Sequence, residues 1–330
     1  MRSRARAGGT ERVVSLGHAS LCPSHPNQFK SKIVSSDSWT IGRLLTWTTE
    51  HLKKHGSDTP RLDAEVLLAF ARGCQRIELY TSFDEVASDD LRAKFRELVR
   101  ERSEGKPVAY LVGYREFYSH KFRVSPAVLI PRPETEFLVV SLVDLIDELA
   151  EQRPNDEPIT VADVGTGSGI IAVCATRHSA RVRVTAVDVS AEALAIARQN
   201  AVDAKVADRI TFAESDLFAA IPSTERYDFI ASNPPYVSDS ELEQLARDVQ
   251  KYEPRLALAA GPTGTAVIER LIPQAAERLK PGGWLLMEIS PMLEQRVGEL
   301  VQADGRFEQA STVKDLAQLA RVVRAQRKSD

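Results

Sequence analysis

The sequence predicts an α/β protein: a doubly wound, mostly parallel sheet of seven strands with a small helical domain before it. Two observations support this fold class. From Ile159 onward, short apolar runs alternate with stretches of helical periodicity. Between Ile41 and about residue 110, apolar residues recur at helical spacing only. Since strands that alternate with helices form parallel sheets covered on both faces, the second part is expected to be doubly wound.

Length and composition favour two folded domains. The 330 residues are enough for two domains of ordinary size, and 43% hydrophobic residues can fill their cores. The 43 Lys and Arg are balanced by 46 Asp and Glu, so no global basic field favours nucleic acid as a direct partner. No apolar run approaches the ~20 residues that span a bilayer. We therefore expect a protein or small-molecule substrate, no membrane insertion, and a monomer.

Cysteine and histidine do not indicate a metal site. Cys22, Cys74 and Cys174 are scattered and lack the spacing of zinc ligands, and no histidine joins them in a cluster. An odd, scattered set of cysteines also argues against a disulfide framework. We expect no metal and a reducing compartment.

Residues 1–37 are expected to form a disordered basic tail. Glu11 is their only acid before Asp37, arginines are frequent, and apolar periodicity is lacking. An organelle transit peptide has this character, and a long or misassigned bacterial start gives the same appearance. We favour the bacterial cytoplasm, with an organelle matrix as the alternative.

The remaining chain divides into three expected parts. Residues 38–110 form the helical domain, 111–130 a linking β-hairpin that turns at Ser119-His120, and 131–330 the sheet domain. Helices are expected at Asp89–Ser103, about 134–149, Ala191–Asn200 and Ala266–Leu279. The strand-like runs are Thr160–Val164, Val182–Val187, Arg209–Ala213, Tyr227–Ser232, Gly283–Ile289, Phe307–Thr312 and Leu319–Val323.

A glycine-rich turn follows the first of these strands. In Gly165-Thr166-Gly167-Ser168-Gly169, backbone can approach a ligand closely, and the helix start behind it offers free N–H groups. This predicts a nucleotide-type cofactor. A dinucleotide fingerprint needs a third glycine where Ile170 stands, so a dehydrogenase is disfavoured. Asp188 ends the next strand, where a carboxylate can accept both ribose hydroxyl protons.

A second motif, Asn233-Pro234-Pro235-Tyr236, follows the strand-like run Tyr227–Ser232. An amide nitrogen is a poor nucleophile, so an enzyme must orient it. The Asn233 side-chain oxygen and the Pro234 C=O can accept its two N–H groups, while Tyr236 offers a flat face. The prolines hold these acceptors in extended backbone. The alternative is a plain turn with a local Asn hydrogen bond, which the position opposite the glycine loop disfavours.

The glycine spacing resembles the first motif of S-adenosylmethionine-dependent methyltransferases. That resemblance implies the Rossmann-like fold of class I methyltransferases and S-adenosylmethionine as the cofactor. The loop Gly165–Gly169 and Asp188 would hold it, with Asp163 at its ammonium end. Asp216 and Leu217 would meet the adenine, and Asn233 would adjoin the methyl group. A cap role for Asp163 and a core role for Leu217 are the alternatives.

Over about Ser38 to Arg324, the chain resembles the HemK/PrmC family, the glutamine methyltransferases of peptide chain release factors. The resemblance implies that the substrate is the glutamine of a Gly-Gly-Gln motif in class-1 release factors, bound in part by the helical domain. The segments that carry the resemblance are Gly105–Gly113, Ile130–Glu136, Gly165–Gly169, Asn233–Tyr236, Tyr252–Arg255 and Lys314–Leu316.

The same resemblance implies that Arg132, Glu134 and Glu136 line the substrate entrance, beside Asn233–Tyr236. Helix capping or domain linking is the alternative for the two acids. We expect a structural role for Tyr252–Arg255. The chain departs from the family after Glu288, where Ser290 and Leu293 replace the usual Gly and Gln.

Two other functions share parts of this pattern. DNA adenine methyltransferases also carry the four-residue turn, but the balanced charge disfavours a DNA substrate. A non-catalytic binding protein on the same fold would be expected to lose Asn233 or the loop glycines. We therefore expect an enzyme that methylates glutamine.

Overall fold

The computed structural model describes residues 38–154 and 156–329, so the expectation for residues 1–37 lies outside the described residues. The first described segment is helical, and two of its helices begin at hydroxyl caps. The Thr40 side chain accepts a hydrogen bond from the backbone N–H of Arg43, and Ser88 accepts one from Leu91. The helices are α1 (Ile41–Lys54), α2 (Pro60–Arg72), α3 (Arg76–Thr81), α4 (Asp89–Ser103) and α5 (Val108–Val112).

These helices enclose a core of their own. Ile41, Leu45 and Leu52 on α1 are buried together with Leu67 and Leu68 on α2. The spacing of these residues places them on one face of each helix. The range expected for α4 matches the structure.

A two-stranded hairpin follows, as expected around Ser119-His120. Strands β1 (Tyr114–Phe117) and β2 (His120–Arg123) pair in antiparallel register, with Phe117 opposite His120. Both residues of the connecting turn, Tyr118 and Ser119, have positive φ. Such turns match the twist of paired strands.

The predicted fold class is confirmed by a seven-stranded sheet in the order β5-β4-β3-β6-β7-β9-β8. Strands β3 to β7 run parallel, and β9 is antiparallel to both β7 and β8. The strand order reverses between β3 and β6, which makes their carboxyl ends the switch point. The strands are β3 (Ile159–Val164), β4 (Val182–Asp188), β5 (Ile210–Glu214), β6 (Tyr227–Ser232), β7 (Leu279–Glu288), β8 (Ser311–Lys314) and β9 (Ala320–Gln326).

One strand expectation was wrong in position. The run Phe307–Thr312 was expected to be a strand, but the regular strand is β8, Ser311–Lys314. Phe307 forms only an isolated bridge to Arg327, and its side chain is buried beneath α12 and α11. Its apolar character reflects that burial rather than a regular strand.

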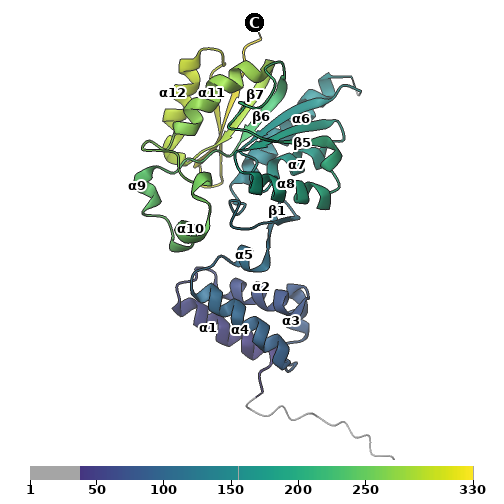
Figure 1. Cartoon of the computed structure of the whole chain (residues 1–330), viewed down its shortest axis with the longest axis vertical. Coiled ribbons are helices and arrows are strands. Elements are labelled where there is room, and N and C mark those ends of the chain that lie inside the picture. Colours follow the sequence, from purple (N-terminus) through teal and green to yellow (C-terminus); the bar gives the residue numbers. More distant parts are fainter. Residues whose placement is uncertain (1–37, 155, 330) are drawn as a thin grey trace, which may run out of the picture. The chain divides into compact units, whose positions relative to one another are not determined.

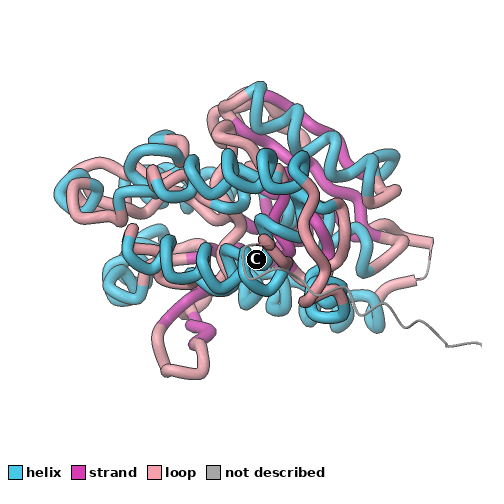
Figure 2. Tube along the Cα trace, turned by 90° about the horizontal axis from the view of Figure 1, so that it is seen from below, coloured by secondary structure: helices cyan, strands magenta, loops and turns pink. Residues whose placement is uncertain are grey.

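Helices cover both faces of the sheet, as Figure 1 shows for α6, α7 and α8 on one side and α11 and α12 on the other. In Figure 2 the strands form a group flanked by helices. The two hydrophobic cores lie between the sheet and these layers. The helices are α6 (Thr135–Gln152), α7 (Ile170–His178), α8 (Ala191–Asp203), α9 (Asp239–Leu242), α10 (Arg247–Tyr252), α11 (Ala266–Arg278) and α12 (Glu294–Asp304), with short 3₁₀ turns at Ala207–Arg209, Arg255–Ala257 and Pro291–Leu293.

Within the described residues, none of the helices is long and apolar enough to cross a membrane. The same part of the chain holds no group of three or more His, Cys, Asp or Glu side chains placed to bind a metal ion.

Candidate active site

Four strands end within one residue of the same row at the carboxyl edge of the sheet. Val164 of β3 pairs with Ser232 of β6 and with Val187 of β4, and Ser232 also pairs with Met287 of β7. Strands β3 and β6 end at this row, and β4 and β7 end one residue beyond it, so the four residues that follow the row lie side by side. They are Gly165, Asp188, Asn233 and Glu288.

The glycine loop needs its glycines for backbone reasons. Gly165, Gly167 and Gly169 have φ of 73°, 55° and 82°, a region that other residues rarely adopt. A Cβ at Gly169 would also lie 3.0 Å from the Cβ of Ala197 on α8. At Gly165, which is exposed, no heavy atom lies within 4 Å of such a Cβ. The loop thus packs tightly at its end and leaves space at its start.

Asp188 ties this loop to the end of β4. Its Oδ2 accepts a hydrogen bond from the backbone N–H of Gly167 at 2.8 Å, and its Oδ1 accepts one from Ser190 at 3.0 Å. Each carboxylate oxygen can accept a second hydrogen bond. Because the residue is only half-buried, both oxygens keep acceptor capacity for a ligand.

Asp163, which precedes the loop, is fully buried. Its Oδ2 accepts hydrogen bonds from the Thr166 hydroxyl at 2.6 Å and from the backbone N–H of Ala172 at 3.1 Å. Its Oδ1 has no partner among the described residues. Burial raises the pKa of this carboxyl to about 7, against those two hydrogen bonds.

The side chains of Thr166 and Ser168 are buried rather than open to the crevice. The Thr166 hydroxyl is occupied by Asp163, and the backbone C=O of Ser168 accepts from the amide of Asn200. Burial of these two side chains is compatible with the expected approach of the loop backbone to a cofactor, and their cofactor role stays a prediction.

Asn200 is a residue that the sequence reasoning missed. It is buried on α8, and its amide nitrogen donates to the C=O of Ser168 at 2.8 Å and to that of Arg123 at 3.1 Å. Its Oδ1 accepts from the N–H of Arg123 at 2.7 Å. One side chain thus joins the glycine loop to the hairpin. An asparagine on the otherwise apolar face of a helix was the available signal.

Asp216 and Leu217 follow β5 and differ in exposure. The Asp216 carboxylate is half-exposed and accepts a hydrogen bond from Arg270 at 2.6 Å. Leu217 is buried in the core beside Phe218, with a positive φ of 51°. The core interpretation of Leu217 is therefore correct for its side chain. The segment lies at the carboxyl edge of the sheet because it follows the last residue of β5, Glu214.

The Asn233–Tyr236 turn is braced from both sides. The Asn233 Nδ2 lies 3.3 Å from the Oγ1 of Thr135, the first residue of α6. Beyond the turn, Val237 forms a parallel bridge with Ala259. A Cβ at Gly264 would lie 2.8 Å from the C=O of Tyr236, so only glycine allows this close approach. The turn is thus held by parts of the chain that are distant in sequence.

Tyr236 reaches a buried acid, Glu288. The Tyr236 hydroxyl lies 3.5 Å from Oε1 of Glu288, whose other oxygen has no partner among the described residues. Burial raises the pKa of Glu288 to about 7 and, with this carboxyl beside it, raises the pKa of Tyr236. Tyr236 is therefore a neutral phenol at physiological pH.

Three side chains expected at the substrate entrance are placed differently from one another. Arg132 donates to Glu253 at 2.5 Å, and Glu253 is buried and also accepts from the N–H of Ile130. Glu136 accepts from the N–H of Tyr118 and so fixes the hairpin, as the domain-linking alternative anticipated. Glu134 is half-buried and raises the pKa of both Glu288 and Tyr236 by its charge. The charge of Arg132 acts on Tyr236 in the opposite sense and lowers its pKa. The structural role expected for Glu253 fits its contacts.

Glu288 and Thr135 were not anticipated as parts of this site. The signal for Glu288 was its position as the last residue of a strand, where parallel sheets place functional groups. Thr135 has no such signal, since a threonine at the first turn of a helix is common. Only the folded chain brings it to Asn233.

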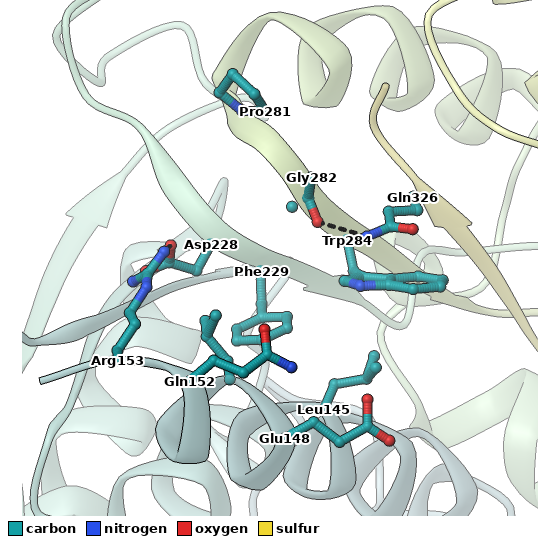
Figure 3. A pocket seen from close by; sticks show the side chains of 12 residues that line it. Leu145, Glu148, Gln152, Arg153, Asp228, Phe229, Pro281, Gly282, Trp284 and Gln326 are labelled. Atoms are coloured by element: carbon teal, nitrogen blue, oxygen red, sulfur yellow. Dashed lines mark hydrogen bonds and ion pairs between the residues drawn. The ribbon is translucent and has the colours of Figure 1, made fainter. Parts of the chain in front are cut away.

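A separate pocket lies at the opposite, amino end of the strands. It measures about 200 Å³ and is lined by the last turns of α6 and the starts of β6 and β7, including Arg153, Asp228 and Trp284 (Figure 3). Asp228 is satisfied there by Arg153 at 2.6 Å, Lys280 at 3.0 Å and Thr160. This pocket is stabilised by its own ion pairs and is distinct from the crevice at the carboxyl edge.

Comparisons with known proteins agree with this geometry. The model of the PrmC N-terminal domain matches residues 43–113, and the methyltransferase small domain matches residues 144–251. The release factor glutamine methyltransferase of Rhodopirellula baltica is 50% identical over 88% of this chain and 97% of its own length. That of Koribacter versatilis is 42% identical over 86% and 97%. Among solved structures, the hMettl16 catalytic domain, at 16% identity and a TM-score of 0.51, covers 68% of this chain and 81% of its own, and it shows the shared fold.

The residues at the carboxyl edge fit S-adenosylmethionine. The start of the glycine loop leaves open space, Asp188 retains acceptor capacity, and the unpaired Oδ1 of Asp163 is a buried acceptor directly beneath the loop. A cofactor that carries hydroxyl groups and positive charge matches this set of acceptors. The chain is an S-adenosylmethionine-dependent methyltransferase, and it belongs to the family of release factor glutamine methyltransferases.

Proposed function

We propose that this protein methylates the side-chain amide nitrogen of the glutamine in the Gly-Gly-Gln motif of class-1 peptide chain release factors. The observation that carries the proposal is the pairing of Val164 with Ser232. It places the glycine loop and the Asn233–Tyr236 turn on adjacent strand ends at the switch point. The name shared by the relatives supports the substrate class.

On the cofactor side, the backbone of Gly165–Gly169 surrounds the ligand, and Asp188 accepts the ribose hydroxyl protons. Asp163 acts at the ammonium end, through the loop or through water, because its carboxyl is buried. The Asp216-Leu217 segment adjoins the adenine, Asp216 by polar contact and Leu217 by its backbone position. When bound, S-adenosylmethionine supplies an electrophilic methyl group carried on a sulfonium.

On the substrate side, Asn233 Oδ1 and the Pro234 C=O accept the two amide N–H groups. Pro235 keeps the turn rigid, and the Tyr236 ring packs against the planar carboxamide. Two acceptors favour the positive charge that develops on nitrogen during attack. The proton leaves after transfer, when the nitrogen has become acidic. Glu134 lies beside the turn, whereas Arg132 supports the entrance through Glu253.

We assign partner recognition to residues 38–110, linkage to 111–130 and catalysis to 131–330. The helical segment exposes large apolar side chains, including Trp47 at 51% and Ile77 at 66%. Exposed apolar groups of this kind favour a protein partner. We place the enzyme in the bacterial cytoplasm, as a monomer that contacts the release factor and no nucleic acid directly.

The test uses purified full-length enzyme, labelled methyl donor, and a release factor or its Gln-to-Ala variant. Label is expected in the release factor and not in the variant. Equal labelling of both proteins would exclude the glutamine assignment. Labelling of an adenine-containing DNA duplex instead would favour the DNA methyltransferase alternative.

A further inference from the structure

The Asn233–Tyr236 turn belongs to neither a strand nor a helix. Strand β6 ends before it at Ser232, and α9 begins after it at Asp239. Two of its four residues are prolines, which have no N–H to donate to a neighbouring segment. The two proposed substrate acceptors, Asn233 Oδ1 and the Pro234 C=O, therefore depend for their position on the segments that pack beside the turn.

One such segment is the loop Leu258–Gly264 before α11, named here the bracing loop. It pairs with Val237, the residue that directly follows the turn. The N–H of Val237 donates to the C=O of Leu258 at 3.0 Å, and its C=O accepts from the N–H of Ala260 at 2.9 Å. These two backbone hydrogen bonds fix the bracing loop alongside the end of the turn.

Gly264 closes the bracing loop against the turn itself. The residue is buried, its φ is 72°, and a Cβ built on it would lie 2.8 Å from the backbone oxygen of Tyr236. Carbon and oxygen atoms stay about 3.3 Å apart even in a weak C–H···O contact. A side chain at Gly264 would therefore push the Tyr236 carbonyl and the bracing loop apart.

The bracing loop is itself fixed to the start of α11. The N–H of Ala266, the first residue of this helix, donates to the C=O of Ala260 at 3.2 Å. Thr265, the N-cap residue, is fully buried, and its Oγ1 donates to Oε1 of Glu269 at 2.9 Å. Helix α11 packs on the hydrophobic core of the sheet. The contact at the Tyr236 carbonyl is therefore backed by a helix that packs on the sheet.

We propose that the bracing loop, through Gly264, is a positioning element that sets where the Asn233–Tyr236 turn presents its acceptors to the substrate amide. The inference rests on the proposed function and extends it to a segment outside the two motifs. A shift of the Tyr236 carbonyl is passed on to the acceptors, because Pro234 and Pro235 leave the turn little freedom to absorb it. A misplacement of about 1 Å can lower a rate about 100-fold.

The first experiment compares Gly264→Ala with Gly305→Ala. Gly305 ends α12 with a φ of 74°, and no heavy atom beyond its chain neighbours lies within 4 Å of an added Cβ. The control therefore carries the same backbone strain without the close contact. Measurements are kcat, the KM for the release factor, the donor Kd by calorimetry, and the urea midpoint of unfolding.

Gly264→Ala is expected to lower kcat roughly 10-fold or more, because the acceptors move away from the substrate amide. Its donor Kd is expected to stay within about threefold of wild type, since the glycine loop is unchanged. Gly305→Ala is expected to retain the wild-type kcat despite its backbone strain.

A second series tests the bracing loop without a new side chain at Gly264, and it decides the matter if Gly264→Ala does not fold. Thr265→Val removes the hydroxyl that bonds to Glu269, and Thr265→Ser keeps it. Thr176→Val is the matched control, because Thr176 is equally buried on α7 and donates to the C=O of Ala172 at 2.7 Å. Thr265→Val is expected to lower kcat about threefold or more at unchanged donor Kd, while the other two variants retain kcat.

Full kcat in folded Gly264→Ala would overturn the inference, as would full kcat in Thr265→Val where the first variant does not fold. An equal loss of kcat in the matched controls, or a donor Kd that weakens in parallel with kcat, would also overturn it. These outcomes are read against wild-type enzyme. If wild type does not methylate the release factor glutamine, the proposed function itself fails. If it does, the two series decide the inference alone.

Discussion

The carboxylate of Asp188 accepts a hydrogen bond from the backbone N–H of Gly167 at 2.8 Å. This contact joins the end of one strand to the loop that follows its neighbour. The acid expected to hold the ribose therefore also shapes the loop that surrounds the cofactor.

Replacement of Asp188 by alanine is expected to weaken methyl-donor binding roughly 10- to 100-fold, because charged hydrogen bonds are worth about 1.5–3 kcal/mol. The measurement is the donor Kd by calorimetry. Asp203→Asn serves as the control, since Asp203 is exposed on α8 and pairs with Arg123 on the surface. Unchanged donor affinity in Asp188→Ala would remove this residue from the cofactor site.

Asn233→Ala is expected to retain donor binding and to lower kcat by about 100- to 1,000-fold, the range for loss of one preorganised polar group. Steady-state kinetics with the release factor, combined with calorimetry, separate the two effects. Gln302→Ala, an exposed substitution on α12, should behave as wild type. Turnover retained in Asn233→Ala would show that the turn does not hold the substrate amide.

Alanine substitutions at the two ends of the glycine loop are expected to differ in their effects on stability and on donor binding. Alanine at Gly169 meets both a positive φ and the Cβ of Ala197, so we expect a loss of roughly 2–4 kcal/mol in unfolding free energy. Alanine at Gly165 meets only the backbone strain, about 1–2 kcal/mol, but its methyl group occupies the open start of the loop.

Urea unfolding and donor calorimetry of both variants check this prediction. Gly169→Ala should be the less stable protein. When the loss of donor affinity is compared with the loss of unfolding free energy in each variant, Gly165→Ala should lose more affinity for the same loss of stability. If Gly169→Ala instead lost more donor affinity for the same loss of stability, the open space for the donor would not lie at Gly165.

Asp163 is expected to make stability depend on pH. Because burial raises its pKa to about 7, the folded protein binds a proton that the unfolded chain releases above its ordinary pKa of 3.8. Stability should therefore fall as pH rises from 4 toward 7 and level off above it. Asp163→Asn keeps an acceptor for Thr166 and Ala172 and removes the titration.

The check is the free energy of unfolding, without donor, between pH 5 and 8. Asp163→Asn should show a flatter profile than wild type, and Glu288 and Glu253, whose pKa values burial also raises, contribute to the slope that remains. Identical slopes in the two proteins would mean that Asp163 stays ionised in the fold.

Arg132→Met is expected to destabilise the protein by roughly 3 kcal/mol, because it leaves the buried Glu253 without its ion-pair partner. Burial already raises the pKa of Glu253, so protonation should relieve the loss at low pH and make it larger at pH 8 than at pH 5.5. Arg123→Met, which breaks an exposed pair, should cost less than about 1 kcal/mol. Unchanged stability with a raised KM for the release factor would instead place Arg132 at the substrate entrance.

The sequence by itself determined the order of strands and helices, the two motifs at their strand ends, and the class of cofactor. These features are local: Gly165, Gly167 and Gly169 are required by backbone conformation, and the prolines at 234 and 235 restrict their own φ. Periodicity and turn chemistry act over a few residues, so they can be read directly from the chain. The family resemblance added the substrate class and the entrance residues.

The tertiary structure alone decided which side chains share one surface. Thr135 meets Asn233, Glu288 meets Tyr236, and Asn200 joins the loop to the hairpin, although each pair is distant in sequence. It also paired the guanidinium of Arg132 with the carboxylate of Glu253. Strand register and helix packing set these contacts. Both depend on the whole core, so no local pattern specifies them.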